Sequence, residues 1–437
     1  MNVELSSGLK AKRSNSLKSL YKMELVRIST AGSVDDGKST LIGRLLFDNN
    51  ALTKEQEELV AKKTAEKGWD DLDLSVITDG LVAEREQGIT IDVANMYFST
   101  DTHKFIITDS PGHVEYTRNM VTGASMAETS IILIDARKGL LEQSYRHFYI
   151  SHLLRLKRVI FAVNKMDLVE YDQDRFLEIA VEIQRMVEGL NAAVPYTVVP
   201  VSSLKGDNVV KPSENMTWYQ GKTLNGLLHE THPDISESQP LRFDVQHVTH
   251  SQENGFVDYR GYSGRVISGT VSVGDTLRVL PSKKESVVTE IRRYTETKDK
   301  AISGDSVSIS LADEIDISRG AILVHPDETP EPQQTVKATL VWMDEKDANV
   351  GSKWLMKAAS REFPVKLQTI LQSVDPTKKN ATDNKNVIAL NDITEVEIRL
   401  SQPGYFDAYE TNKKNGIFIL IDPQTNNTVA VGFVKGE

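Results

Sequence analysis

A glycine-rich segment near the N-terminus has the spacing of a loop that binds phosphate groups. Residues 32–39 read GSVDDGKS, which fits the pattern G-x-x-x-x-G-K-[S/T], and a stretch of helical period follows. The glycines let backbone N–H groups turn toward phosphate oxygens, and the next helix directs its positive end at them. An apolar run before the loop and a helix after it favour this interpretation over a chance match. The expected nucleotide contacts are Gly32, Ser33, Val34, Asp35, Asp36, Gly37, Lys38, Ser39 and Thr40.

Two side chains of this loop have specific expected roles. We expect Lys38 to pair with the β- and γ-phosphates during catalysis, and the Ser39 hydroxyl to ligate Mg²⁺. A second Gly-Lys-Thr occurs at residues 221–223, but Met216 stands where the loop pattern needs its first glycine. The sequence therefore contains one full phosphate loop.

A second group of candidate residues follows the apolar run at residues 104–109. A carboxylate at Asp109 is suited to hold Mg²⁺ through water, and glycine at Gly112 allows its N–H to approach the γ-phosphate. A lone histidine is more often structural than catalytic, but the position of His113 directly after that glycine favours a role in orienting the attacking water. The candidate segment is Asp109, Ser110, Pro111, Gly112 and His113.

A charged segment between these two groups contains a further candidate. Residues 84–90 read EREQGIT, and Thr90 is suited to bring a hydroxyl to Mg²⁺ when the triphosphate is present. A segment ordered by the γ-phosphate and the metal is a nucleotide-dependent switch. Taken alone, it is a solvated turn with one threonine, and the neighbouring motifs favour the switch. The expected metal ligands are therefore Ser39, Thr90 and Asp109, and the expected catalytic residues are Lys38, Thr90 and His113.

The choice of base is predicted from two segments further along the chain. A carboxylate at Asp167 can accept hydrogen bonds from N1–H and the 2-amino group of guanine, which adenine does not offer, so this site should select GTP. Backbone N–H groups near Ser203 are suited to contact the guanine carbonyl. The candidate base contacts are Asn164, Lys165, Met166, Asp167, Ser202, Ser203 and Leu204.

These residues share one position relative to the expected strands. Short apolar runs alternate with stretches of helical period, which is typical of a mostly parallel sheet in an α/β domain. The expected strands cover residues 25–31, 104–109, 130–136, 158–164 and 196–202. Apart from the segment at residues 84–90, each candidate segment begins where such a run ends, and ligands of open parallel sheets bind beyond the carboxyl ends of strands.

The pattern of apolar and polar residues changes after a proline-bounded stretch at residues 232–240. Short alternating runs interrupted by glycines then predict a small antiparallel β-barrel, and a second proline-rich stretch at residues 325–332 leads to another strand-rich segment. We therefore expect a P-loop α/β domain followed by two antiparallel β-barrel domains. The expected bounds are a basic tail at 1–23, a GTP-binding domain at 24–235, and barrels at 240–327 and 333–437.

Bulk composition restricts the partners and the compartment. The 437 residues include no cysteine, which excludes disulfides and thiolate chemistry and agrees with a cytoplasmic protein. Sixty-two acidic residues against 51 basic ones give a net charge of −11, so free polyanions are disfavoured and no nucleic-acid partner is expected. No apolar run is long enough to cross a bilayer, and no membrane association is expected.

With these residues in place, the chain resembles the translation-factor class of GTPases, such as elongation factor Tu. That class shares G-H-V-D-x-G-K-[S/T], R-x-x-G-I-T, D-x-P-G-H and N-K-x-D. The loop departs from it at Ser33 and Asp36, and GSVDDGKSTLIGRLL (32–46) resembles the GTPase subunit of bacterial sulfate adenylyltransferase. Further matching stretches are AEREQGITIDVA (83–94), YTRNMVTGAS (116–125), LIDARKG (133–139), EIDISRG (314–320) and ALNDI (389–393).

This resemblance implies a function shared between two subunits. In that family a smaller catalytic subunit joins sulfate to ATP, giving adenylyl sulfate and pyrophosphate, and GTP hydrolysis drives the uphill reaction. The implied cofactors are GTP and Mg²⁺, and the implied assembly is a hetero-oligomer such as a heterodimer. The residues that carry over are Gly32, Asp35, Gly37, Lys38, Ser39, Thr90, Asp109, Gly112, His113, Asn164, Lys165 and Asp167.

Departures from the family and competing functions complete the expectations. Ser203 stands where the family usually has alanine, and we expect little change because the backbone N–H makes that contact. Some relatives carry a fused adenylyl-sulfate kinase domain, whose activity we expect to be absent here. The alternatives are a translation factor that binds RNA or the ribosome, and a GTP-binding scaffold without useful hydrolysis.

Overall fold

The computed structural model describes most of the chain as two compact units. The described residues are 23–67, 72–78, 94–109, 120–121, 124–125, 127–190, 194–232, 238–251, 259–294, 296–375, 382–383 and 386–436. The first unit ends at Asp234, and the second covers nearly all of the remaining chain. Within the described ranges, no helix has the length and apolar character needed to span a membrane.

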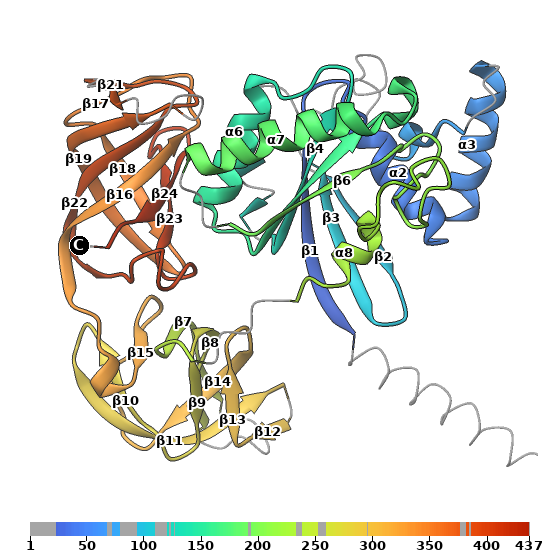
Figure 1. The fold of residues 1–437 in the computed structure, drawn as a ribbon. Helices are drawn as coiled ribbons and strands as arrows, with labels where there is room; N and C mark the ends of the chain where they lie inside the picture. Colours follow the sequence, from blue (N-terminus) through green and yellow to red (C-terminus); the bar gives the residue numbers. More distant parts are fainter. Residues whose placement is uncertain are drawn as a thin grey trace, which may run out of the picture. The chain divides into compact units, whose positions relative to one another are not determined.

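The first unit is an α/β domain with a six-stranded sheet in the order β2-β3-β1-β4-β5-β6 (Figure 1). Neighbouring strands pair in parallel except β2, which runs antiparallel to β3 at the edge. The five expected apolar runs all form strands. The strands are β1 (Glu24–Ala31), β2 (Ala94–Ser99), β3 (His103–Asp109), β4 (Thr129–Asp135), β5 (Arg158–Asn164) and β6 (Tyr196–Pro200).

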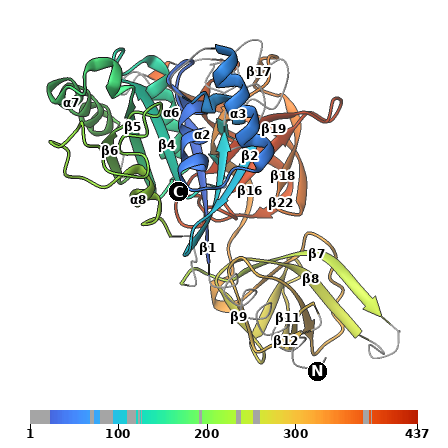
Figure 2. The ribbon, with the colours of Figure 1, turned by 90° about the vertical axis from the view of Figure 1, so that its right-hand side faces the viewer.

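Helices flank this sheet (Figure 2). Apolar residues of α2 and α8 join those of β1, β3, β4 and β5 in one buried cluster. A Cβ on Gly43 of α2 would lie 2.2 Å from the Leu74 carbonyl oxygen, so glycine lets α2 pack directly on η1. The helices are α2 (Lys38–Asp48), α3 (Lys54–Lys67), η1 (Leu74–Ile77), α6 (Glu142–Leu153), η3 (Met166–Val169), α7 (Gln173–Gly189) and α8 (Leu224–Leu228).

The second unit begins with a closed antiparallel barrel. Strands pair in the order β10-β15-β7-β8-β14-β11-β12, and the pairing of β10 with β11 closes the sheet around a buried apolar core. Alternate residues of β11 are buried, as expected when one face of each strand packs inward. The elements are β7 (Arg242–Ser251), β8 (Tyr259–Ser268), β9 (Thr270–Ser272), β10 (Thr276–Leu280), β11 (Lys284–Arg293), β12 (Glu296–Lys298), β13 (Lys300–Ile302), β14 (Ser306–Leu311), β15 (Ile322–Val324) and η4 (Pro326–Glu328).

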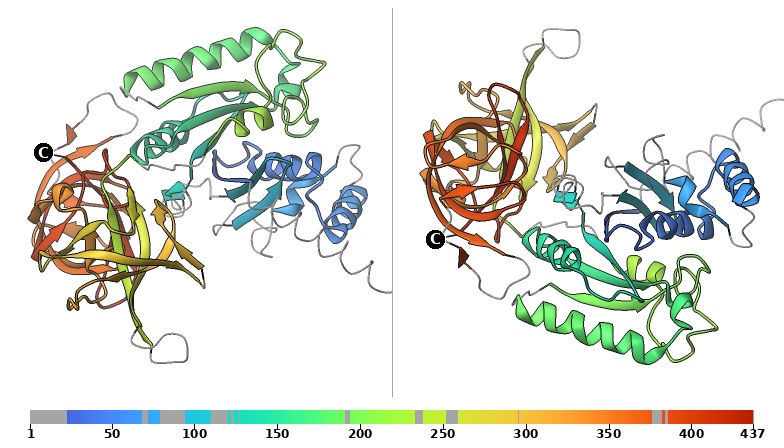
Figure 3. Two further views of the ribbon diagram at one scale, coloured as in Figure 1. Left: turned by 90° about the horizontal axis from the view of Figure 1, so that it is seen from below. Right: turned by 90° about the horizontal axis from the view of Figure 1, so that it is seen from above.

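A second barrel follows in the same unit. Its strands pair in the order β18-β23-β24-β16-β22-β19-β20, β18 also pairs with β19, and the orange and red strands form a ring in end-on view (Figure 3). The predicted fold class, a P-loop α/β domain followed by two antiparallel barrels, is therefore confirmed. The strands are β16 (Pro332–Trp342), β17 (Ala348–Asn349), β18 (Lys353–Ala358), β19 (Arg361–Val374), β20 (Thr382–Asp383), β21 (Val387–Ile388), β22 (Ile393–Tyr405), β23 (Ile417–Ile421) and β24 (Thr428–Val434).

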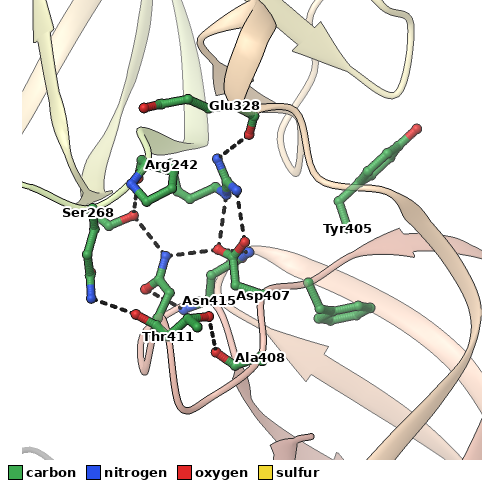
Figure 4. A network of polar contacts seen from close by, with 12 residues as sticks. Arg242, Ser268, Glu328, Tyr405, Asp407, Ala408, Thr411 and Asn415 are labelled. Atoms are coloured by element: carbon green, nitrogen blue, oxygen red, sulfur yellow. Dashed lines mark hydrogen bonds and ion pairs between the residues drawn. The ribbon is translucent and has the colours of Figure 1, made fainter. Parts of the chain in front are cut away.

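A buried polar network joins the two barrels (Figure 4). The Arg242 guanidinium donates to both carboxylate oxygens of Asp407, at 3.0 and 2.8 Å, and to the Glu328 carbonyl at 2.9 Å. Asn412 and Asn415 each donate to the same carboxylate at 2.9 Å. Both charges are thus paired and hydrogen-bonded, which compensates their removal from water.

Candidate nucleotide-binding site

The glycine-rich loop turns tightly between β1 and α2. Asp35 has a φ of 69° and Gly37 a φ of 92°, a left-handed conformation that glycine adopts without strain. A Cβ on Gly37 would lie 2.5 Å from Asn164 Nδ2, so the close approach also requires glycine. Gly37 is the N-cap of α2 and provides no side-chain hydrogen bond to it. A helix N-terminus of this kind is suited to receive an anion.

Lys38 and Asp109 meet at the carboxyl edge of the sheet. Lys38 opens α2, Asp109 ends β3, and the Nζ atom of Lys38 lies 3.9 Å from Asp109 Oδ1. The Thr30 hydroxyl donates to the same carboxylate oxygen at 3.0 Å, which orients it. Both charged side chains are buried, while Ser39 and Thr40 are half-buried in the first turn of α2. Lys38, a predicted phosphate contact, and Asp109, a predicted metal residue, therefore lie next to each other.

Asp36 is a buried carboxylate within the loop. Its Oδ2 accepts a hydrogen bond from the Ser33 backbone N–H at 2.7 Å, and burial raises the pKa of Asp36 to about 6. Among the described residues, Asp36 Oδ1 and the Ser33 hydroxyl have no hydrogen-bond partner. A buried polar atom left in this state costs about 1–3 kcal/mol. The loop therefore retains unused hydrogen-bonding capacity, while Val34 is exposed.

Asn164 links the glycine-rich loop to the loop after β6. Its Nδ2 donates to the Asp36 carbonyl at 2.8 Å, and its Oδ1 accepts from the backbone N–H of Ser203 at 3.0 Å. The Ser203 hydroxyl donates to the same Oδ1 at 2.8 Å. Asn164 is fully enclosed, so its amide holds three segments together. The sequence had predicted Asn164 only as a base contact.

Asp167 lies in η3, which follows β5, and is only partly buried. The Ser202 hydroxyl donates to Asp167 Oδ1 at 2.6 Å, and no hydrogen bond to Oδ2 is found in the described part of the chain. The side chain of Met166 is buried, and its N–H donates to the Val201 carbonyl at 3.2 Å. The backbone of Met166 thus anchors Asp167, whose carboxylate has an oxygen available.

Two residues that the sequence interpretation did not assign complete the surroundings of Lys165. Asp135, at the end of β4, accepts from the Arg137 guanidinium at 3.0 and 2.6 Å and lies 3.1 Å from Lys165 Nζ. Hydrogen bonds from Arg137 and Lys165 outweigh burial and hold the pKa of Asp135 well below its ordinary value. Lys165 also donates to the Asp35 carbonyl. The in-register pairing of Asp135 with Asn164 could have identified this group once adjacent parallel strands were assumed.

Arg44 connects α2 to the segment Ser203–Leu204. Its Nε donates to the Ser203 carbonyl at 3.1 Å, and its guanidinium also donates to the Leu204 carbonyl. Arg44 is buried and pairs with Asp48 one turn further on at 3.5 Å. The arginine was part of a family-like stretch, but its spacing from the motifs gave no indication of this contact.

Five predicted site residues lie outside the described residues. They are Thr90, Ser110, Pro111, Gly112 and His113, and the basic tail at 1–22 lies outside them as well. The described site therefore consists of the phosphate loop, Asp109, and the loops that follow β5 and β6. These come from four strand ends spread over more than half of the first unit and converge at one edge of the sheet.

Comparison with known proteins matches each part of the chain to a family. The family model "Elongation factor Tu GTP binding domain" matches residues 23–254, "Elongation factor Tu domain 2" matches 262–324, and "GTP-eEF1A C-terminal domain-like" matches 335–435. The structure resembles the Ski7 GTPase-like domain of S. cerevisiae bound to GTP, with a TM-score of 0.50 and 18% identity over 96% of this chain and 98% of that one. That likeness supports the fold.

Relatives of much higher identity share one name. Sulfate adenylyltransferase subunit 1 of Bacteroides fragilis is 44% identical over 417 residues, covering 94% of this chain and 86% of the relative. The subunit 1 of Colwellia psychrerythraea is 45% identical over 422 residues, covering 96% and 89%. The resemblance predicted from the motifs is confirmed, and use of a guanine nucleotide follows from the GTP-binding domain. The chain belongs to the sulfate adenylyltransferase subunit 1 family, built on the elongation factor Tu type of GTP-binding domain.

Proposed function

We propose that this chain is the GTP-hydrolysing subunit of a sulfate adenylyltransferase. On this proposal, GTP hydrolysis drives the formation of adenylyl sulfate and pyrophosphate from ATP and sulfate, which a smaller catalytic partner subunit carries out. The observation that carries the proposal is the set of polar groups at one sheet edge, in a chain whose relatives are named for that enzyme. A location in the cytoplasm and the domain limits expected from the sequence are part of the same proposal.

The phosphate side of the site fits a triphosphate. Gly37 gives the N-terminus of α2 no side-chain cap, and Lys38 is a buried cation 3.9 Å from Asp109 Oδ1. Among the described residues, polar atoms of Ser33 and Asp36 have no hydrogen-bond partner. A polyphosphate with its metal would use donors and acceptors of this kind, and the positive end of a helix adds to its binding. Lys38 then stabilises charge that develops on the β- and γ-phosphates.

The base side of the site fits guanine. Asp167 Oδ1 accepts from the Ser202 hydroxyl, and Oδ2 accepts no hydrogen bond from the described residues, which leaves it for a ligand. A carboxylate accepts from both N1–H and the 2-amino group of guanine. The neighbouring Lys165 is held in place by its ion pair with Asp135. We assign base selection to Asp167, and the framing of its loop to Asn164 and Ser203.

The residues around Asp109 fit a magnesium ion. Oxygen ligands suit Mg²⁺, and Ser39 follows directly on Lys38, whose Nζ lies 3.9 Å from Asp109 Oδ1. When bound, Mg²⁺ neutralises the charge of the β- and γ-phosphate oxygens. Ser39 and Thr90 supply hydroxyl oxygens, Asp109 acts through water, and His113 orients the attacking water. The contributions of Thr90 and His113 rest on sequence position.

A reconstitution experiment tests the proposal. The full chain would be co-purified with the smaller subunit from the same source, and GTP hydrolysis measured with ATP and sulfate added singly and together. We expect hydrolysis to rise when both are present, and adenylyl sulfate to form in proportion to GTP consumed. Many GTPases are slow until a partner completes the site, so the chain alone should turn over slowly.

Two variants sharpen this experiment. Lys38→Ala should lower coupled turnover by about 10²–10³, the scale of losing one charge-stabilising donor in an active site. Lys54→Ala, an exposed lysine at the start of α3, is the matched control and should retain turnover. If the rate of GTP hydrolysis did not change with ATP and sulfate but rose with ribosomes, the translation-factor alternative would replace the proposal.

A further inference from the structure

Three side chains that can bind a metal ion meet at the amino ends of the strands, on the side of the sheet opposite the nucleotide loops. Glu24 opens β1, His103 opens β3, and His232 follows α8 (Figure 1). β1 and β3 are parallel and pair Glu24 directly with His103. Their amino ends therefore lie together, far from the carboxyl ends that carry the phosphate loop and Asp109.

The three ligand atoms are close together. Glu24 Oε2 lies 2.8 Å from His232 Nδ1 and 3.7 Å from His103 Nε2, and all three atoms lie within 4.8 Å of one another. Zn²⁺ binds such atoms at roughly 2.0–2.2 Å, which sets ligand atoms roughly 3.3 Å apart around a tetrahedral ion. The side chains of Glu24 and His232 are 44% and 67% exposed, so small rotations can bring them to that spacing.

His103 gives an independent indication of a ligand. The residue is 7% exposed, and its Nε2 is buried with no hydrogen-bond partner among the described residues. Its other ring nitrogen, Nδ1, lies 2.8 Å from the Thr102 hydroxyl. In the tautomer whose Nδ1–H donates to this hydroxyl, Nε2 presents a lone pair, which is the usual arrangement of metal-bound histidine.

A simpler explanation accounts for only part of this cluster. A simple hydrogen bond between Glu24 and His232 explains the positions of those two side chains. It leaves the buried Nε2 of His103 without a function, whereas a metal ion would use it.

We propose that Glu24, His103 and His232 bind one divalent transition-metal ion of the Zn²⁺ class. Two imidazole nitrogens and one carboxylate oxygen are typical zinc ligands, with water in the remaining position. Mg²⁺ prefers an all-oxygen octahedron, so this site is chemically distinct from the one at the nucleotide. The ion would tie β1 and β3 to His232, two residues before the first unit ends at Asp234.

The proposal predicts a defined zinc stoichiometry. Untagged full-length chain without nucleotide, in buffer containing Mg²⁺, would be dialysed against Zn²⁺ and its bound metal counted by mass spectrometry. We expect one tightly bound Zn²⁺ per chain. Co²⁺ in its place should give visible d–d absorption of a low-coordinate nitrogen and oxygen site, and anomalous scattering should locate the ion between the three side chains.

Matched variants separate this site from adventitious binding. His232→Ala and Glu24→Gln change exposed side chains, so the fold should persist, and each should weaken Zn²⁺ binding by at least about tenfold. His250→Ala removes an exposed histidine from β7 and should leave Zn²⁺ affinity unchanged. GDP binding should be equal in all three, which keeps this test separate from the proposed GTPase function. Absence of bound Zn²⁺, or equal affinity in wild type and both cluster variants, would overturn the proposal.

Discussion

The nucleotide site and the junction between the barrels are both buried polar networks, and they differ in how completely the protein satisfies them. At the junction, Asp407 accepts four hydrogen bonds, two from Arg242 and one each from Asn412 and Asn415. At the nucleotide site, Asp167 accepts one from Ser202, and Asp36 Oδ1 accepts none from the described residues.

This difference separates a structural network from a binding site. A satisfied network fixes one arrangement of the elements it joins, because breaking any bond leaves a buried charge unmatched. A network with unused acceptors and donors is costly without a ligand and is completed by one. Removing a polar group should therefore reduce stability at the junction and change ligand binding at the nucleotide site.

The largest effect should appear in base selection. In Asp167→Asn one acceptor oxygen becomes a donor, so the contact with N1–H and the 2-amino group of guanine is lost. A site built on such pairing discriminates by about 10⁴, and we expect preference for GTP over xanthosine triphosphate to fall by that order. Competition binding measures it. Asp174→Asn, at an exposed position of α7, is the control, and unaltered GTP preference in Asp167→Asn would remove the base-reading role.

A substitution at the junction between the barrels should lower the stability of the two-barrel unit. Asp407→Ala leaves the buried Arg242 guanidinium unpaired and should lower the free energy of unfolding of the two-barrel unit by about 3–5 kcal/mol. Faster amide hydrogen exchange in β16 and β22 should report this loss locally. The affinity for GTP should be unchanged. Glu285→Ala breaks the exposed pair with Arg278 and should cost at most about 1 kcal/mol. Equal losses in the two variants would contradict the comparison.

Asp36 should give a pH-dependent effect. Its pKa in the folded chain is about 6 against an ordinary 3.8, so its ionisation opposes folding above pH 6 and has no effect below pH 3.8, where it is protonated in both states. Asp36→Asn should therefore gain stability relative to wild type as pH rises through this window, by up to about 3 kcal/mol. Melting curves of the nucleotide-free proteins test this, and parallel pH profiles would contradict it.

Ser203 should give the smallest effect. Ser203→Ala removes one hydroxyl hydrogen bond to Asn164 Oδ1, while the backbone N–H still donates to the same atom at 3.0 Å. The expected cost is about 1 kcal/mol, the usual net value of one hydrogen bond. GDP affinity measured by calorimetry should fall less than tenfold, and a larger loss would mean that the hydroxyl itself orders the base loop.

The sequence predicted the parts of this molecule that are determined by short, local residue patterns. Buried parallel strands appear as short apolar runs, and the phosphate loop has a fixed spacing because glycine conformation and helix geometry require it. β2 was not among the expected strands, because it lies at the sheet edge and alternate residues such as Tyr97 are exposed.

Contacts between distant segments could not be predicted in the same way. Arg44 meets Ser203 across 159 positions of sequence, and Arg242 meets Asp407 across 165, so no spacing rule links them. The burial of Asp36 also depends on the assembled loops. These features follow from packing in three dimensions, and the charges that produce them look like ordinary surface residues in the sequence.

The contact of Arg44 with the segment Ser203–Leu204 has a consequence for nucleotide exchange. One guanidinium fastens α2 to the loop after β6, and the Asn164 amide fastens the glycine-rich loop before α2 to that same segment. On the proposed binding mode, these are the phosphate side and the base side of the site. Displacing α2 would therefore loosen both ends of the nucleotide at once. Dissociation of the spent nucleotide should be a single concerted event, and a factor that promotes it needs to disturb one helix.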